Sequence, residues 1–144
     1  MHLFSNLKPL HSFLLHGAYS WLLISGFLHF GIDVVSQYIR GKRAPSPATT
    51  LYYGLNSSYA VSQILFAAMA LFAIRQGATA MGQWSGIVLG LLAACVWFVL
   101  SLLVLEYPQP RMTVALFAAL LVGVALTASH SDRLPITYST QEIP

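Results

Sequence analysis

Four long apolar stretches, separated by short polar segments, dominate the pattern of this chain. They cover about residues 11–38, 50–74, 84–105 and 112–128. About 20 apolar residues cross a bilayer as an α-helix, so the first three stretches are long enough and the fourth is only just so. The pattern predicts an all-α protein, an integral membrane four-helix bundle with antiparallel transmembrane spans, in a single domain over 1–144.

The polar segments between the spans contain residues that stop helices. Loop one (40–47) holds three cations and two prolines, and loop two (76–83) is rich in glycine. Loop three (106–111) again contains two prolines. Proline cannot continue a helix interior, so each span should end before these residues. The polar tail, 129–144, is expected to be poorly ordered.

Composition supports a membrane location. Of the residues, 57% are hydrophobic and only 8% are charged, whereas about a quarter are charged in a soluble domain. The net charge of +3 is spread thinly, which gives no patch for nucleic acid. Positive charge near span ends favours the cytoplasmic side, and loops one and three carry more of it than the opposite side. The compared cations are Arg40, Lys42, Arg43 and Arg111 against Lys8, Arg75 and Arg133.

Small residues recur every fourth position in the third and fourth spans. In the third they are Gly82, Gly86, Gly90 and Ala94; in the fourth they are Ala115, Ala119, Gly123 and Thr127. Helices in lipid associate through close backbone packing at small residues, so these rows predict the seam between the two spans. The alternative is a homodimer through the glycine face. Trp84, Trp97 and Tyr107 are interpreted as interface anchors or lipid-facing aromatics, and Cys95, the only cysteine, as a small hydrophobe.

The first two spans carry polar residues at helical spacing. On the first they are Ser25, His29, Asp33, Gln37 and Arg40; on the second, Tyr52, Asn56, Tyr59 and Gln63. Residues three or four apart share one helix face. If the two helices form a hairpin about Pro45, Asp33 lies level with Asn56, His29 with Tyr59 and Gln37 with Tyr52. The sequence therefore predicts two facing polar stripes.

These stripes allow two interpretations. They either hold the two helices together by hydrogen bonds or form a functional site, because ionisable residues inside a membrane tend to be functional. In the second interpretation Asp33 orients the imidazole of His29 for proton transfer, and Glu106 supplies a second acid. His29, Asp33 and Glu106 are then the catalytic candidates. The ligand-binding candidates are Gln37, Tyr52, Asn56, Tyr59 and Gln63.

Other chemistries find little support in the sequence. Zinc needs three or four ligands, and His29 with Asp33 supplies two, so no metal site is expected. A haem between the first and fourth spans, held by His11, His16 or His130, would need two facing axial ligands, which the sequence does not indicate. No nucleotide or nucleophile motif is present. We therefore expect no cofactor.

The second span also carries a resemblance. Gly54-Leu55-Asn56-Ser57-Ser58-Tyr59 is similar to a Gly-x-Asn-x-Ser-His-like pattern that opens the second helix of a group of uncharacterised bacterial four-helix membrane proteins. Tyr59 stands where those proteins often have histidine. The layout also resembles the DoxX-like and EXPERA-type (emopamil-binding, sterol-isomerase) bundles, without any of their catalytic motifs. The resemblance implies a multi-pass protein of a bacterial inner membrane, and the distribution of Lys and Arg favours loops one and three in the cytoplasm.

Two hypotheses about function follow. The first is a protein that binds a lipophilic small molecule (isoprenoid, sterol-like or quinone) in a semi-polar intramembrane cavity between the first two helices. Proton-transfer or isomerase chemistry at His29 and Asp33 would belong to it. The second is a non-enzymatic accessory subunit of a larger membrane complex, which would bind its partners through the glycine and alanine faces. An ion conductor fits less well, because the last two spans lack a polar lining.

Overall fold

The structure is a computed structural model that describes residues 7–131. Most of these residues form helices. In order they are α1 (Leu7–His29), the π-helix η2 (Phe30–Ser36), α2 (Gln37–Ile39), α3 (Pro47–Arg75), the 3-10 helix η3 (Thr79–Met81), α4 (Trp84–Val104) and α5 (Gln109–Ser131). No strand occurs among these residues. The all-α prediction is confirmed. Of the predicted tail, 129–131 forms the end of α5 and 132–144 lies outside the described residues.

Four of the helical stretches are long and apolar enough to cross a membrane. They are Pro9–Ile39, Pro47–Arg75, Trp84–Val104 and Gln109–Ala128. The first is 31 residues long because α1, η2 and α2 follow one another without a break. The fourth has 20 residues, so it is longer than the predicted span 112–128. It begins at Gln109 because Pro110 fits the first turn of a helix.

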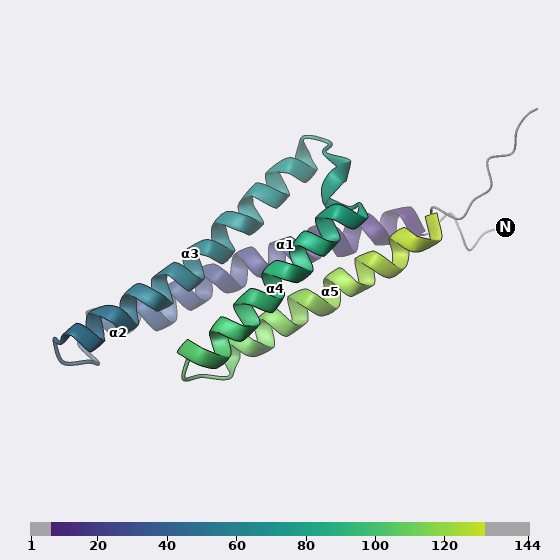
Figure 1. The fold of residues 1–144 in the computed structure, drawn as a ribbon. Coiled ribbons are helices and arrows are strands. Elements are labelled where there is room, and N and C mark those ends of the chain that lie inside the picture. The colour runs from purple at the N-terminus through teal and green to yellow at the C-terminus, as the bar shows by residue number, and fades with distance from the viewer. Residues whose placement is uncertain (1–6, 132–144) are drawn as a thin grey trace, which may run out of the picture.

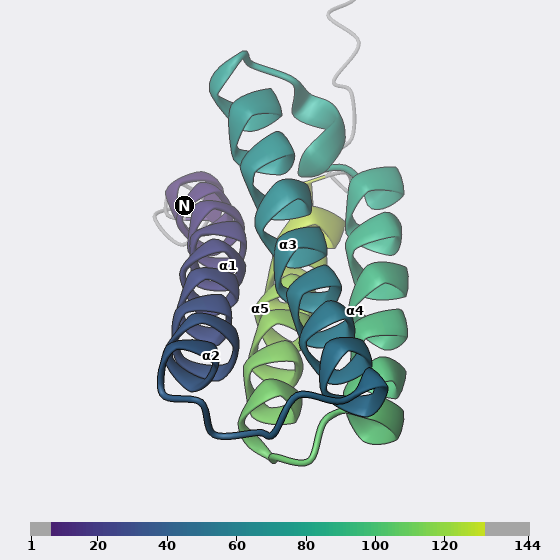
Figure 2. The same cartoon turned by 90° about the vertical axis from the view of Figure 1, so that its left-hand side faces the viewer.

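The four long helices lie alongside one another (Figures 1 and 2). α1 packs against both α3 and α5, and α4 packs against α5. The start of α1 and the end of α5 lie at one end of the molecule, and loops one and three lie at the other (Figure 1). The tip of the α1–α3 hairpin reaches beyond the turn between α4 and α5 (Figure 1). α5 therefore begins beside the flank of that hairpin.

Local chemistry explains the ends of the hairpin. At the start of α3 the Ser46 side chain accepts a hydrogen bond from the Thr49 amide at 3.1 Å, and Pro47 occupies the first turn. Serine at the cap and proline just after it are the preferred residues there. Gly41, after α2, has φ of +57°, and Gly77, after α3, has φ of +76°. Glycine adopts this left-handed conformation without the cost that a side chain adds.

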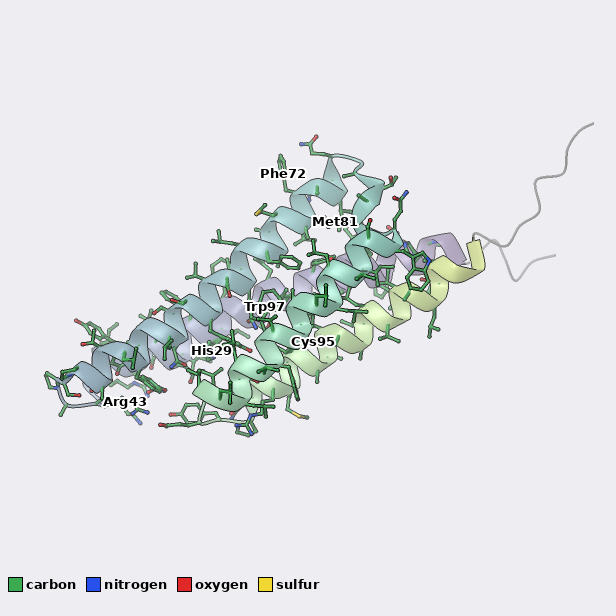
Figure 3. The ribbon with its side chains drawn as sticks, in the orientation of Figure 1. His29, Arg43, Phe72, Met81, Cys95 and Trp97 are labelled. Atoms are coloured by element: carbon green, nitrogen blue, oxygen red, sulfur yellow. The ribbon has the colours of Figure 1, made fainter. Side chains whose placement is uncertain are left out.

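Aromatic side chains fill the middle of the molecule. The ring of Tyr19 from α1 lies 5.7 Å from that of Phe117 in α5 and 6.1 Å from that of Phe66 in α3. The Trp97 ring lies 5.4 Å from the Phe66 ring, and its indole N–H donates to the Ser62 hydroxyl at 3.0 Å. Trp97 is only 6% exposed, so its interpretation as an anchor or lipid-facing residue is wrong. It joins α4 to α3 in the interior, between the positions of His29 and Met81 along the molecule (Figure 3).

The predicted row of small residues on α4 faces inward. Gly86, Gly90 and Ala94 are buried. A Cβ on Gly90 would meet a methyl carbon of Leu121 in α5 at 2.7 Å, and a Cβ on Gly86 would collide with the backbone of Ala80 and Met81 in η3. This row thus lets α5 and η3 approach α4 closely, as small residues do in membrane helices.

The row predicted on α5 coincides with the packing face of this helix only at Thr127, which is buried. Ala115 and Ala119 are exposed, so they do not contribute to the seam with α4. The face of α5 that packs inward carries mostly large side chains. Its buried residues are Val114, Phe117, Leu121, Val124 and Thr127. At this seam Gly90 of α4 packs against the large side chain of Leu121 in α5, since the missing side chain lets the helices approach.

The first span contains a π-helical segment that the sequence does not predict. It follows His29 directly and includes Asp33. A π-turn holds more residues than an α-turn, so it rotates the residues after it relative to those before it, and such bulges are frequent at functional sites. Even so, Ser25, His29, Asp33 and Gln37 all border one cavity, which confirms that they share a face. Arg40 lies beyond the helix and is exposed.

Candidate functional site

A cavity of about 460 Å³ lies between α1, α3 and the beginning of α5. Its volume falls in the range of about 300–1,000 Å³ that is usual for small-molecule sites. The first span supplies the longest wall, from Trp21 to Gln37, across α1, η2 and the start of α2. The polar side chains that line it from this span are Ser25, His29, Asp33 and Gln37.

His29 and Asp33 form a close pair inside this cavity. The Nδ1 atom of His29 lies 2.8 Å from Oδ2 of Asp33, and their side chains are 8% and 21% exposed. The other carboxylate oxygen of Asp33 accepts a long hydrogen bond, 3.5 Å, from the Gln37 amide. Asp33 thus has contacts on both oxygens, and the three residues form a polar ladder along one side of the cavity.

The pairing determines which nitrogen of His29 exchanges a proton. A carboxylate only accepts hydrogen bonds, so Nδ1 carries a proton and donates it to Asp33. In the neutral ring Nε2 then has the free lone pair, and it is the atom that gains or loses a proton. This nitrogen is buried, and the Asn56 side chain of α3 faces the ring. An imidazole oriented by a carboxylate is an arrangement that general acid–base chemistry uses.

Helix α3 contributes Tyr59 and Gln63 to the opposite wall. The Tyr59 ring meets the His29 ring edge to face, with 5.4 Å between centroids, which confirms that these two residues lie at the same level. The Tyr59 hydroxyl and the Gln63 Nε2 are buried, and the two side chains face each other one turn apart on α3.

The start of α5 closes the cavity, a contribution that the sequence does not predict. Thr113 lines the cavity together with Gln109, Pro110 and Tyr107 of the preceding turn. At the inner end the indole N–H of Trp21 donates to the Thr113 carbonyl at 3.0 Å and ties α1 to α5. No local pattern in these residues indicates a site, because they meet α1 only through the tertiary fold.

The outer rim of the cavity is apolar. Ile24, Leu28 and Ile32 line it and are also 55%, 57% and 60% exposed. They therefore stand at the boundary between the cavity and the surroundings of α1. An apolar rim around a polar interior suits a molecule that has both an apolar part and a polar group.

Two predicted ligand-binding residues lie away from this cavity. Asn56 is fully buried and donates to the Tyr52 carbonyl at 2.9 Å; it faces the His29 ring but does not line the cavity. Tyr52 lies nearer loop one, where its ring stacks against the guanidinium of Arg43 at 3.6 Å. Neither residue borders the cavity. Of the predicted ligand-binding residues, Tyr52 and Asn56 therefore lie outside the cavity wall.

Glu106 lies outside the cavity wall as well. Its carboxylate accepts a hydrogen bond from Arg43 at 3.0 Å, and its side chain is 60% exposed. Arg43 marks the end of the molecule where loop one lies, and His29 lies further in (Figure 3). The structure thus places Glu106 in an ion pair between loops one and three, apart from His29 and Asp33. Its neighbour Tyr107 lines the cavity instead.

Histidines elsewhere are engaged in local contacts. His11 Nδ1 lies 2.9 Å from the Thr127 hydroxyl of α5, and His16 Nδ1 donates to the Ser12 carbonyl at 2.8 Å. The side chain of the third haem candidate, His130, lies outside the described part of the chain. Within that part, no group of three or more His, Cys, Asp or Glu residues has the arrangement of a metal site.

Comparison with known proteins adds no assignment to this geometry. No family model, no curated protein and no solved structure matches this chain.

Proposed function

We propose that this chain is a multi-pass protein of a bacterial inner membrane that binds a lipophilic small molecule in the cavity beside His29. In this proposal the four helices insert as an antiparallel bundle, with loops one and three in the cytoplasm. The observation that carries the proposal is the pairing of His29 with Asp33 in a cavity with an apolar rim. Isoprenoids, sterol-like lipids and quinones are the ligand classes that combine these two characters.

The energetics of burial support a site over a purely structural role. Helix–helix hydrogen bonds in a membrane contribute on average less than about 1 kcal/mol each. A role in joining helices would require the polar atoms to pair with one another. Here the closest polar contact, His29 with Asp33, lies within the first span, and Tyr59 faces Gln63 within α3. Among these side chains only Asn56, which faces His29, reaches from α3 to the first span. The polar stripes therefore hold the helices together poorly, which supports a site in the cavity.

The same geometry supports proton transfer on the bound molecule. A proton would pass from the ligand to Nε2 of His29, and the imidazolium that forms would be stabilised by the Asp33 carboxylate. Return of that proton to a second atom of the ligand completes an isomerisation without any change of oxidation state. Glu106, the second acid of the sequence-based hypothesis, has no place in this step because it lies in the ion pair with Arg43.

The decisive experiment is mass spectrometry of small molecules released from purified protein. The test variant replaces both His29 and Asp33 by leucine, which leaves no unpaired charge in the cavity. The matched control is His16→Leu, because His16 is exposed and its hydrogen bonds are to Ser12 of its own helix, away from the cavity. We expect a lipophilic molecule with the wild type and the control, and its loss from the double variant.

A different outcome would support the competing function. If the wild type carries no lipophilic molecule but purifies with a stoichiometric protein partner, the binding proposal is wrong and an accessory subunit is the better interpretation. Equal retention of the molecule by the double variant would also refute the assignment of the site. The control excludes a general effect of replacing histidine by an apolar side chain.

A further inference from the structure

We infer that a second pocket, beside loop one, binds the phosphate headgroup of an anionic membrane lipid. This pocket shares no lining residue with the cavity beside His29. The inference rests on the membrane insertion in the proposed function, but it does not depend on a ligand in that cavity. Three observations carry it: the shape of the pocket, the charge around it and its place at the ends of two spans.

The pocket is built by the end of the first span, loop one and the start of α3. It has a volume of about 670 Å³. Tyr38 and Tyr53 form its aromatic side, and their rings meet edge to face with 5.7 Å between centroids. Gly41 turns the chain with φ of +57°, and the Ser46 side chain caps α3. The loop is therefore ordered without a ligand, so binding costs little loss of its freedom.

Positive charge gathers at this pocket. Arg40, Lys42 and Arg43 fall within four consecutive residues, and no Asp or Glu is among the described residues that line the pocket. Arg43 lines it, and the guanidinium of Arg43 stacks on the Tyr52 ring at 3.6 Å. Since arginine presents a fork of donors that matches a phosphate group, an anionic group here would meet a cation that is already positioned.

Two of these cations have no counter-ion within the described region. The carboxylates there, of Asp33 and Glu106, already pair with a histidine and with Arg43. The side chains of Arg40 and Lys42 are exposed and form no ion pair with either carboxylate. Each Lys or Arg beside a membrane strengthens the binding of anionic lipid roughly fivefold, so these two favour an anionic headgroup over a neutral one by roughly 25-fold.

The position of the pocket favours a lipid over a dissolved anion. It lies where the first span ends and the second begins, at the end of the molecule that carries loop one (Figures 1 and 3). Apolar neighbours of its lining residues stay exposed, with Ile39 at 77% and Leu51 at 63%. Tyr38 is 71% exposed, and tyrosine suits the boundary between lipid and water. A lipid would meet both demands, because its phosphate faces the cations while its acyl chains cover the apolar side chains.

Two lipids with identical acyl chains test this inference. Purified full-length protein in a neutral detergent would be titrated with dioleoyl phosphatidylglycerol or dioleoyl phosphatidylcholine, and the bound lipid measured by native mass spectrometry. We expect the first molecule of the anionic lipid to bind at least about tenfold more tightly than that of the zwitterionic one. The double variant Arg40→Gln and Lys42→Gln should lose most of this preference. Glycerol phosphate, the soluble headgroup, should not displace the lipid at equal concentration.

Two further variants separate the pocket from a general effect of charge. Arg75→Gln removes an exposed cation at the far end of α3 and should leave the lipid preference unchanged. Thr50→Trp fills the pocket without a change of charge, because Thr50 lines it and is exposed. This variant should weaken the binding of phosphatidylglycerol about as much as the loss of one cation. All the replaced side chains are exposed, and equal melting temperatures without lipid would check that each variant is folded.

The outcomes separate this inference from the proposed function. Equal binding of the two lipids, an equal loss with Arg75→Gln, or full binding by Thr50→Trp would overturn the lipid site. Displacement of the lipid by equimolar glycerol phosphate would overturn the lipid as the source of the phosphate. The double variant that replaces His29 and Asp33 by leucine should keep its phosphatidylglycerol, so each site fails or holds independently. Recovery of the protein from cells in soluble form, without detergent, would refute both proposals.

Discussion

Gly26→Ala is expected to destabilise the protein, whereas Gly17→Ala on the same helix is expected to stabilise it. A Cβ on Gly26 would lie 2.9 Å from Cγ1 of Ile64 and 3.3 Å from the carbonyl oxygen of Ala60 in α3. A Cβ on Gly17 would have nothing within 4 Å. The missing side chain of Gly26 thus lets α1 and α3 approach closely, one turn before His29.

The expected magnitude follows from two opposing effects. Alanine is favoured over glycine in a helix interior by up to about 1 kcal/mol, and both variants gain this. Overpacking of a filled contact costs about 1–3 kcal/mol, and only Gly26→Ala incurs this cost. The free energies of unfolding of the two variants should therefore differ by about 1–3 kcal/mol, with Gly17→Ala the more stable.

Unfolding in mixed micelles, followed by the fluorescence of the three tryptophans, measures this difference. The wild type and both variants would be titrated with a denaturing detergent under identical conditions. Because wider spacing of α1 and α3 would loosen the contact between the His29 and Tyr59 rings, Gly26→Ala should also bind ligand more weakly. Equal stabilisation by both substitutions would refute the close approach of the helices at Gly26.

Two further predictions concern contacts between helices. Trp97→Phe removes the indole hydrogen bond to Ser62 and should lower the free energy of unfolding by about 1 kcal/mol. Trp84→Phe, at a half-exposed position, should change this free energy little. An effect of equal size at both sites would contradict the burial of Trp97. Glu106→Gln removes the charge of the exposed partner of Arg43 while it keeps the stacking of Arg43 on Tyr52, and it should cost no more than about 1 kcal/mol. Its cost should shrink in high salt, and salt independence of the melting-temperature difference would argue against an electrostatic link between loops one and three.

The candidate site could be predicted only in part, for a reason that lies in helix geometry. Helical spacing is a local property, so the sequence was sufficient to place Ser25, His29, Asp33 and Gln37 on one face. The distance from a common turn relates two helices of a hairpin, and it correctly brought Tyr59 level with His29. The depth of a residue along the hairpin does not determine how α3 is rotated about its own axis. It therefore did not show that Tyr59 and Gln63 line the cavity while Tyr52 and Asn56 do not.

Rotation and side-chain volume decided the packing of the last two helices. Spacing suggested a seam of small residues on both α4 and α5, but Ala115 and Ala119 of α5 are exposed, and buried Gly90 of α4 packs on the large side chain of Leu121. Any set of residues four positions apart forms a stripe along a helix. Which stripe faces inward depends on the shape of the neighbouring helices. Trp97 shows the same limit, since an indole suits an interface and a core equally well until a partner such as Ser62 is known.

By itself the sequence determined the number of long helices, their apolar character and the polar face of the first one. These follow from the chain's own residues, because hydropathy and helical period act over a few turns. Only the tertiary structure decided that α5 closes the cavity through Thr113 and Trp21, that Glu106 pairs with Arg43, and that a π-helical segment carries Asp33. The two contacts join residues 63 and 92 positions apart in the chain, and the π-segment follows from no local residue pattern. Such features exist only once all four helices are packed, which is why the cavity beside His29 could not be outlined from the polar stripes alone.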